Sequence, residues 1–268
     1  MVALLSHLLD HPIQLFVALL VAFLLAAEVG VRWPIWMREK VDQEAPFALS
    51  TIYGAILGLL GLMLGFTFAM ALSRYDSRRH LVVDEADAFG TTWLRSAMIP
   101  QPYRESTVKL LRAYVDTRLE FYAAGLDQQR LRAAIQKSTQ LQTFLWSEAA
   151  SAAHDQPTPI TSLFVQSVNE MIDLDAKRIE ALEDRIPPSV WVVLTIISLV
   201  ASLLTGSFSH RRMSVTLLLV PIVLSVVMTL IADLDSSRSG GILVSQRSMV
   251  RLQAELKEPL PVPPSPRP

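Results

Sequence analysis

The sequence lacks several residue types and patterns that mark common protein classes. It contains no cysteine, which excludes disulfides, thiolate metal sites and cysteine nucleophiles. Its formal net charge is −1 and it has no basic block, so no nucleic-acid partner is predicted. No Ser-His-Asp order, phosphate-binding loop, nucleotide fingerprint or metal triad is present, so the sequence supports no enzymatic activity. The first Lys or Arg is Arg32, and an N-terminus without basic residues predicts a retained membrane helix rather than a signal peptide.

Long apolar stretches are what the sequence does have. A hydrocarbon core of about 30 Å needs about 20 mainly apolar residues in a helix. Four stretches meet that length: Ile13–Val31, Phe47–Leu72, Ser189–Phe208 and Ser214–Ala232. A short polar connection joins the members of each pair, so each pair forms a helical hairpin. The predicted fold is an all-α membrane protein with four transmembrane helices in two hairpins and a water-facing helical bundle between them.

This pattern divides the chain into four parts. They are a first transmembrane hairpin (1–72), a water-facing helical region (73–187), a second transmembrane hairpin (188–234) and a C-terminal segment (235–268) with a disordered, proline-rich tail. No Gly or Pro follows the second span until Gly90, so we expect its helix to continue into water and to end before Pro100. Amphipathic periodicity predicts three further helices, at 103–124, 128–153 and 161–185, with Gly125 and Asp127 as caps between the first two.

The second span carries two contrasting faces. Gly54, Gly58, Gly61 and Gly65 lie within about 60° of one another on a helix, and small residues permit close helix packing in membranes. One interpretation is that this face packs on a helix of the same subunit while the opposite face meets lipid. The other is that the opposite, apolar face lines a pore and gates it by dewetting. The candidate pore-lining residues are Ile52, Ile56, Leu59, Met63, Phe66, Thr67 and Met70.

Several motifs resemble a known family. They are Leu64–Phe66, Ser73–Tyr75, Glu85 and Phe89–Gly90 around the second span, with Glu28–Arg32 near the start and Asp233–Gly241 and Val244–Gln246 near the end. Together they resemble the bacterial bestrophin-like family of uncharacterised membrane proteins over about residues 13–255. The resemblance to bestrophins themselves is confined to the second span and its extension. The aromatic residues expected at a bestrophin pore neck have Phe66 and Phe68 as their nearest counterparts.

The resemblance implies a function and an assembly. Bestrophins are pentameric ion channels with four membrane helices per subunit, a cytosolic helical region and a pore lined by the second helix. It therefore implies a homo-oligomer, expected to be a pentamer, in the bacterial inner membrane, with its termini and helical region in the cytoplasm. The oligomer would pass monovalent ions, with Ile56, Leu59 and Met63 near the neck. The positive-inside rule alone does not settle whether the termini and helical region face the cytoplasm, because basic residues flank the spans on both sides. A membrane-anchored scaffold or sensor that recruits partners and conducts nothing stays open as an alternative.

Acidic residues are the remaining candidates for function. Asp76, Asp84 and Glu85 follow the second span and could line a vestibule that attracts cations, whereas the resemblance to eukaryotic bestrophins includes anion channels, so the choice of ion stays open. Glu28 is the one carboxylate inside an apolar span, and its spacing favours an i,i+4 pair with Arg32 over an ion or proton site.

The end of the fourth span offers a candidate cation site. Asp233 and Asp235 precede a Ser/Gly turn, and oxygen ligands in a tight loop suit calcium. The EF-hand pattern is absent here, however, and a local pair of Asp235 with Arg238 is the competing interpretation. Calcium is therefore a candidate ligand, and no other cofactor is predicted.

Overall fold

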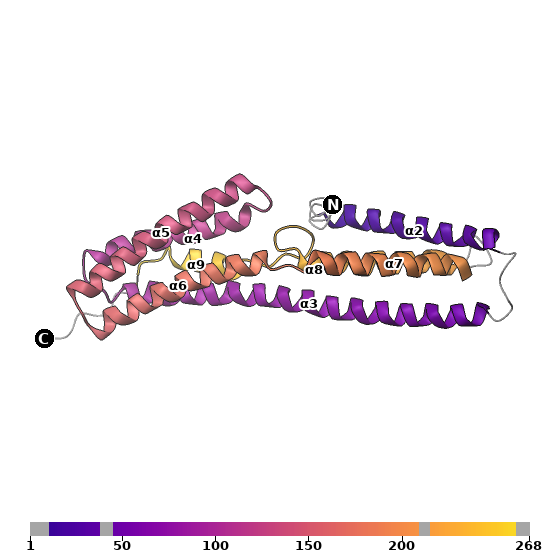
Figure 1. The fold of residues 1–268 in the computed structure, drawn as a ribbon. Helices are drawn as coiled ribbons and strands as arrows, with labels where there is room; N and C mark the ends of the chain where they lie inside the picture. Colours follow the sequence, from indigo (N-terminus) through magenta and orange to yellow (C-terminus); the bar gives the residue numbers. More distant parts are fainter. Residues whose placement is uncertain (1–10, 38–44, 209–214, 261–268) are drawn as a thin grey trace. The chain divides into compact units, whose positions relative to one another are not determined.

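The structure is a computed structural model that describes residues 11–37, 45–208 and 215–260. Within these ranges every regular element is an α-helix, which confirms the predicted all-α class (Figure 1). The chain divides into two compact units: unit 1 is Met1–Tyr75 with Arg185–Leu243, and unit 2 is Asp76–Asp184 with Val244–Pro268. The two predicted polar connections (38–44 and 209–214) and the predicted tail from residue 261 lie outside the described residues.

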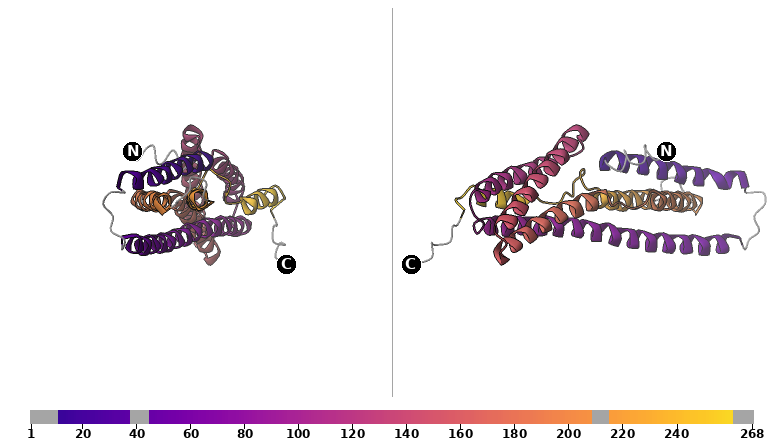
Figure 2. Two further views of the ribbon diagram at one scale, coloured as in Figure 1. Left: turned by 90° about the vertical axis from the view of Figure 1, so that its right-hand side faces the viewer. Right: turned by 60° about the vertical axis from the view of Figure 1, so that its left-hand side comes forward.

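Unit 1 holds the apolar helices. It contains α2 (Pro12–Met37), the first part of α3 (Ala45–Ser96), α7 (Pro188–Phe208) and α8 (Val215–Asp235). The described chain has four helices long and apolar enough to cross a membrane, as the sequence predicted. Helices α2, α7 and α8 lie side by side in both views of Figure 2. All four helices supply the core: Leu15, Leu19 and Phe23; Leu60, Leu64 and Ala71; Trp191, Leu194 and Ala201; Leu224, Met228 and Ile231.

Two isolated glycines allow α2 and α7 to approach closely. A Cβ added to Gly30 would overlap the carbonyl oxygen of Leu203 and lie 2.9 Å from its carbonyl carbon. A Cβ added to Gly206 would overlap the carbonyl oxygen of Ala27 and lie 3.0 Å from the amide nitrogen of Val31. Each helix thus presses a glycine onto the backbone of the other, which is the role that small residues have between membrane helices.

Unit 2 is a bundle of amphipathic helices. It contains the second part of α3, α4 (Tyr103–Ala123), α5 (Gln128–Asp155), α6 (Pro159–Glu183) and α9 (Arg247–Glu255). Its core is apolar and includes Phe89 and Trp93 from α3, Leu111 and Tyr114 from α4, Leu145 from α5, Phe164, Val168 and Met171 from α6, and Met249 and Leu252 from α9.

Local signals explain where these helices begin and end. The Asp127 carboxylate accepts hydrogen bonds from the backbone N–H groups of Gln129 and Arg130, so it caps α5 as predicted. Gly125, just after α4, has a φ of 53° and takes the left-handed conformation that suits glycine. Helix α3 is a single helix of 52 residues, which confirms the predicted extension of the second span. The short helix α9 was not predicted; it is held by burial of Met249 and Leu252.

Candidate functional site

One side of α3 packs inside unit 1 and the other side is open. Leu60, Leu64, Thr67 and Ala71 are buried at helical spacing. The Thr67 hydroxyl donates to the carbonyl oxygen of Met63 at 2.7 Å. The residues on the remaining arc are exposed, because no described helix of the chain covers them. An open, apolar side on a membrane helix must meet lipid, a second chain or a pore.

The structure divides the seven candidate pore residues into two groups. Ile52, Leu59, Phe66 and Met70 are exposed, with 51% of Leu59 and 65% of Phe66 accessible. Ile56 and Met63 are partly buried and pack against the core of unit 1, and Thr67 is only 5% exposed. Only the first group presents its side chains to the outside of the subunit.

The glycine face of α3 is open in the subunit. A Cβ added to Gly54, Gly58, Gly61 or Gly65 would meet no heavy atom of the described chain within 4 Å. The interpretation that this face packs on a helix of the same subunit is therefore not what the described residues show. Its packing against another copy of the chain stays a prediction. Gly30 and Gly206, which the sequence did not single out, are the glycines at a close helix contact.

Glu85 does not lie where the sequence placed it. It is fully buried in unit 2, whereas Asp84 is exposed and Asp76 is partly exposed. The Arg118 Nε donates to Glu85 Oε1 at 2.7 Å, and the Arg178 guanidinium contacts the other carboxylate oxygen. The vestibule assignment of Glu85 is therefore wrong for this structure, since two arginines neutralise its charge inside the bundle.

Glu85 belongs to a buried charge network, which we define as Glu85, Arg118, Asp175 and Arg178. Arg118 bridges Glu85 and Asp175, and its side chain has no solvent exposure. Arg178 also donates to Gln246 Oε1 at 3.0 Å. Burial lowers the pKa of Arg178 to about 9, so its guanidinium is still charged at neutral pH. The network pairs two acids with two bases, so their formal charges cancel.

Aromatic and amide groups complete this network. The Arg178 guanidinium lies 4.1 Å and that of Arg118 5.7 Å from the centre of the Tyr122 ring. Gln142 Nε2 donates at 2.5 Å both to Asp175 Oδ2 and to the Tyr114 hydroxyl. Burial, followed by the negative charge of Asp175, raises the pKa of Tyr114 above its ordinary value.

The two carboxylates proposed for calcium have structural partners. Asp233 Oδ1 accepts the Gly241 N–H at 2.8 Å, and both oxygens of Asp235 face the Ile186 N–H at 3.1 and 3.2 Å. Arg74 lies 3.7 Å from Asp235 Oδ1. In the parts of the chain that the structure describes, no group of three His, Cys, Asp or Glu side chains could hold a metal ion. Among the described residues, Asp233 and Asp235 therefore gain no third carboxylate or histidine, and calcium binding stays a prediction.

Glu28 forms the local pair that its spacing indicated. Its carboxylate accepts the Arg32 Nε–H at 2.9 Å, and both side chains are substantially exposed. This interpretation is confirmed, and Glu28 has a partner that accounts for its charge.

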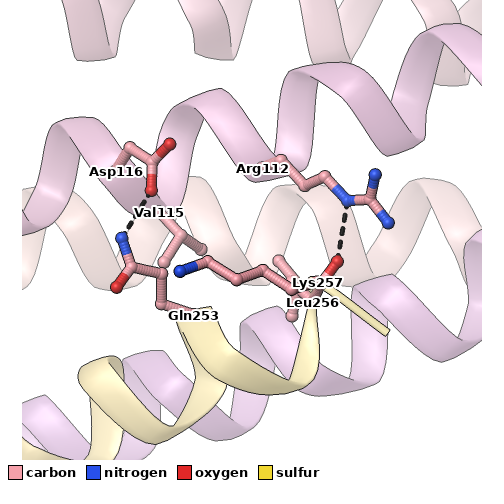
Figure 3. A pocket seen from close by; sticks show the side chains of 6 residues that line it. All are labelled: Arg112, Val115, Asp116, Gln253, Leu256 and Lys257. Carbon is pink, nitrogen blue, oxygen red and sulfur yellow. Dashed lines mark hydrogen bonds between the residues drawn. The ribbon is translucent and has the colours of Figure 1, made fainter. Parts of the chain in front are cut away.

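A small pocket lies where α9 meets α4 (Figure 3). Gln253 Nε2 donates to Asp116 Oδ1 at 2.7 Å, and Arg112 Nε donates to the Leu256 carbonyl at 2.7 Å. The Arg112 guanidinium also lies 5.4 Å from the centre of the Trp93 ring. These contacts anchor the end of α9 to α4, and they account for the polar groups that Figure 3 connects by dashed lines.

Comparison with known proteins now identifies the family. The family model of the Bestrophin-like domain matches residues 12–249. The chain belongs to the Bestrophin-like domain family. Comparison with curated proteins gives no match.

Solved bestrophin structures have the same fold. Two single-substitution variants of a bacterial bestrophin homologue from Klebsiella pneumoniae match with TM-scores of 0.67 and 0.66, at 14% and 12% identity. The first match covers 90% of this chain and 97% of the homologue, and the second covers 91% and 99%. A further structure of the Klebsiella pneumoniae homologue, solved by Zn-SAD phasing, matches with a TM-score of 0.64 at 13% identity, over 91% of this chain and 96% of its own. The predicted family and fold are thus confirmed, and the chain is an integral membrane protein.

The motifs behind the resemblance to the bacterial bestrophin-like family are mainly structural in this chain. Glu85 is the centre of the buried charge network. Phe89 packs on Tyr114 with ring centroids 5.0 Å apart, and Gly90 faces the Leu252 side chain. Asp233 accepts a hydrogen bond from the Gly241 N–H and so stabilises the turn after α8, in which Gly240 has a φ of 100°. Among the motif residues of α3, Phe66 is 65% exposed and presents a large apolar side chain to the outside of the subunit.

Proposed function

We propose that this bestrophin-like protein is the subunit of an oligomeric ion channel, and that α3 lines its pore. The observation that carries the proposal is the open apolar side of α3, where Ile52, Leu59, Phe66 and Met70 are exposed while Leu60, Leu64 and Ala71 on the other side pack into the core of unit 1. Membership of the Bestrophin-like family and the shared fold of bacterial bestrophin homologues support it.

The exposed side chains suit an apolar constriction. Copies of α3 around a symmetry axis would bring identical apolar side chains into rings, and such rings gate by excluding water. Leu59 and Phe66, seven residues apart, lie on the same side of the helix. Ile56, Met63 and Thr67, which pack inside the subunit, would then support this wall from behind.

The glycine face suits contact with a second copy. Gly54, Gly58, Gly61 and Gly65 are open in the subunit and would let a helix from the next copy approach closely. The resemblance to bestrophins favours five copies. Asp84 and Asp76 are the acids left to attract cations at the water-facing side, because the charge of Glu85 is neutralised within the subunit.

Current measurements in planar bilayers test the proposal. The purified oligomer should give discrete unitary currents under asymmetric KCl, and the reversal potential then gives the charge selectivity. Leu59→Ala and Phe66→Ala should raise the unitary conductance, since each removes bulk from the constriction. Leu25→Ala, on an exposed leucine of α2, is the matched control and should leave the conductance unchanged.

Two results would count against the proposal. Unchanged conductance in both α3 variants would remove α3 from the pore wall. Silence from a folded oligomer of the natural sequence and of both variants would instead favour the non-conducting scaffold.

A further inference from the structure

We propose that Glu85, Arg118 and Arg178 are positioning residues that lock the water-facing part of α3 in one register against α4 and α6. The lock itself is a property of unit 2. Its effect on ion flow rests on the proposed function, because only a pore-lining α3 would pass the effect to the current.

The connections of the network support a lock. Glu85 comes from α3, Arg118 from α4, and Asp175 and Arg178 from α6. Gln142 connects α5 to the network through its hydrogen bond to Asp175, and Gln246 connects the segment before α9 through its hydrogen bond from Arg178. Helices α3, α4, α5 and α6 and the residue that precedes α9 therefore reach one charged cluster, and Glu85 is the member through which α3 takes part.

The chemistry of the network permits few arrangements. Apolar side chains can repack after a shift at moderate cost, but a buried carboxylate needs its cation close by. A shift of α3 by one residue would turn Glu85 by about 100° and carry it away from both arginines. Such a shift would leave buried charges without partners, so α3 is either seated in the network or released from it.

Aromatic rings further limit the orientations of the two arginine side chains. Tyr122 lies against the guanidinium groups of both Arg118 and Arg178, and Phe121 lies 4.8 Å from Arg118. These rings limit the directions in which the planar guanidinium groups can turn. The carboxylate of Glu85 thereby meets donors that are already oriented.

Because α3 is one continuous helix, a rotation at Glu85 would also turn the exposed apolar residues proposed to form the constriction. No Gly or Pro interrupts the helix between Phe66 and Gly90, and α3 is a single helix from Ala45 to Ser96. A rotation that frees Glu85 is therefore transmitted along the helix instead of being absorbed by a kink. The network would set how often the exposed apolar face adopts its closed arrangement, without touching an ion.

Distance measurements on spin-labelled protein test the lock directly. Because the chain has no cysteine, Thr91→Cys on α3 and Ala176→Cys on α6 give two labels on exposed positions without background. Labelled subunits are diluted with unlabelled ones, so that distances within one subunit dominate. The natural network should give one narrow distance distribution, and Glu85→Gln should broaden or shift it.

Two further variants separate the lock from simple packing. Glu85→Gln with Arg178→Gln removes one charge of each sign, so the double variant should recover part of the narrow distribution. Glu105→Gln on α4 breaks an exposed pair with Lys109 and is the control that should change nothing. If Glu85→Gln does not fold, Glu85→Asp keeps the charge, shortens the side chain and should broaden the distribution in the same way.

Single-channel recordings on the same proteins complete the test. Glu85→Gln should change the open probability by about tenfold while the unitary conductance is unchanged. An unchanged distance distribution in both Glu85→Gln and Glu85→Asp would overturn the lock. A changed distribution in a protein that never conducts would instead support the lock and refute the proposed channel.

Discussion

The close contact of α2 and α7 gives the most direct test of the structure. We consider Gly206→Ala, which adds one methyl group between the two helices. The new Cβ would overlap the carbonyl oxygen of Ala27 and lie 2.8 Å from its carbonyl carbon. A helix carbonyl is held by its own hydrogen bond and cannot swing away, so the helices would have to separate by about 1 Å. Gly30→Ala should act in the same way through Leu203.

Two opposing effects determine how much Gly206→Ala changes the free energy of unfolding. Overpacking a tight contact costs about 1–3 kcal/mol, and we take the upper half because the obstructing atoms are backbone. Replacing glycine by alanine within a helix returns up to about 1 kcal/mol through helix propensity. The net expectation is a loss of about 1–2 kcal/mol in the free energy of unfolding. Both substitutions separate the same two helices, so the double variant should cost less than the sum of the single ones.

Thermal unfolding in detergent, followed by circular dichroism, measures this effect. Gly58→Ala is the matched control, because an added Cβ there meets no described atom within 4 Å. It should keep or raise the midpoint of the isolated subunit. Equal midpoints for Gly206→Ala, Gly30→Ala and Gly58→Ala would refute the close approach of α2 and α7. A loss of oligomer in Gly58→Ala, seen by size-exclusion chromatography, would support packing of the glycine face on a second copy.

Two further expectations concern polar groups. The pKa of Tyr114 is raised in the folded state, so the contribution of this group to stability is complete below about pH 10 and is lost above it, by at most about 1.4 kcal/mol per pH unit. Tyr114→Phe should therefore lose unfolding free energy less steeply at alkaline pH than the natural protein. Equal slopes of unfolding free energy against pH would contradict this expectation. Asp235→Asn replaces the charged acceptor of the Ile186 N–H by a neutral one and should lower the thermal midpoint, with a loss of unfolding free energy below the about 1.5–3 kcal/mol of a whole hydrogen bond to a charged group. Added calcium should leave the thermal midpoint of the natural protein unchanged if Asp233 and Asp235 serve only these structural contacts. A calcium-dependent rise of the midpoint that is absent in Asp235→Asn would instead support a calcium site at these residues.

Local sequence was enough for the architecture of this protein. Apolar length predicts the four spans, because a span depends on the hydropathy of consecutive residues. The absence of Gly and Pro after Phe66 predicts the extension of α3, and Asp127 predicts the start of α5, because both depend on neighbours along the chain. The family could also be inferred from short motifs, and the match over residues 12–249 confirms it.

Tertiary structure decided which residues the candidate site contains. Glu85 stands between Asp84 and Asp87 and is indistinguishable from a charged helix surface until Arg118 and Arg178 are brought to it by other helices. Four regularly spaced glycines in α3 are open, whereas the isolated Gly30 and Gly206 form the tight contact. Whether a charge is neutralised or a glycine is covered depends on atoms that are distant in the chain and close in space. A pattern along one helix carries no record of those partners, and only the packed helices supply them.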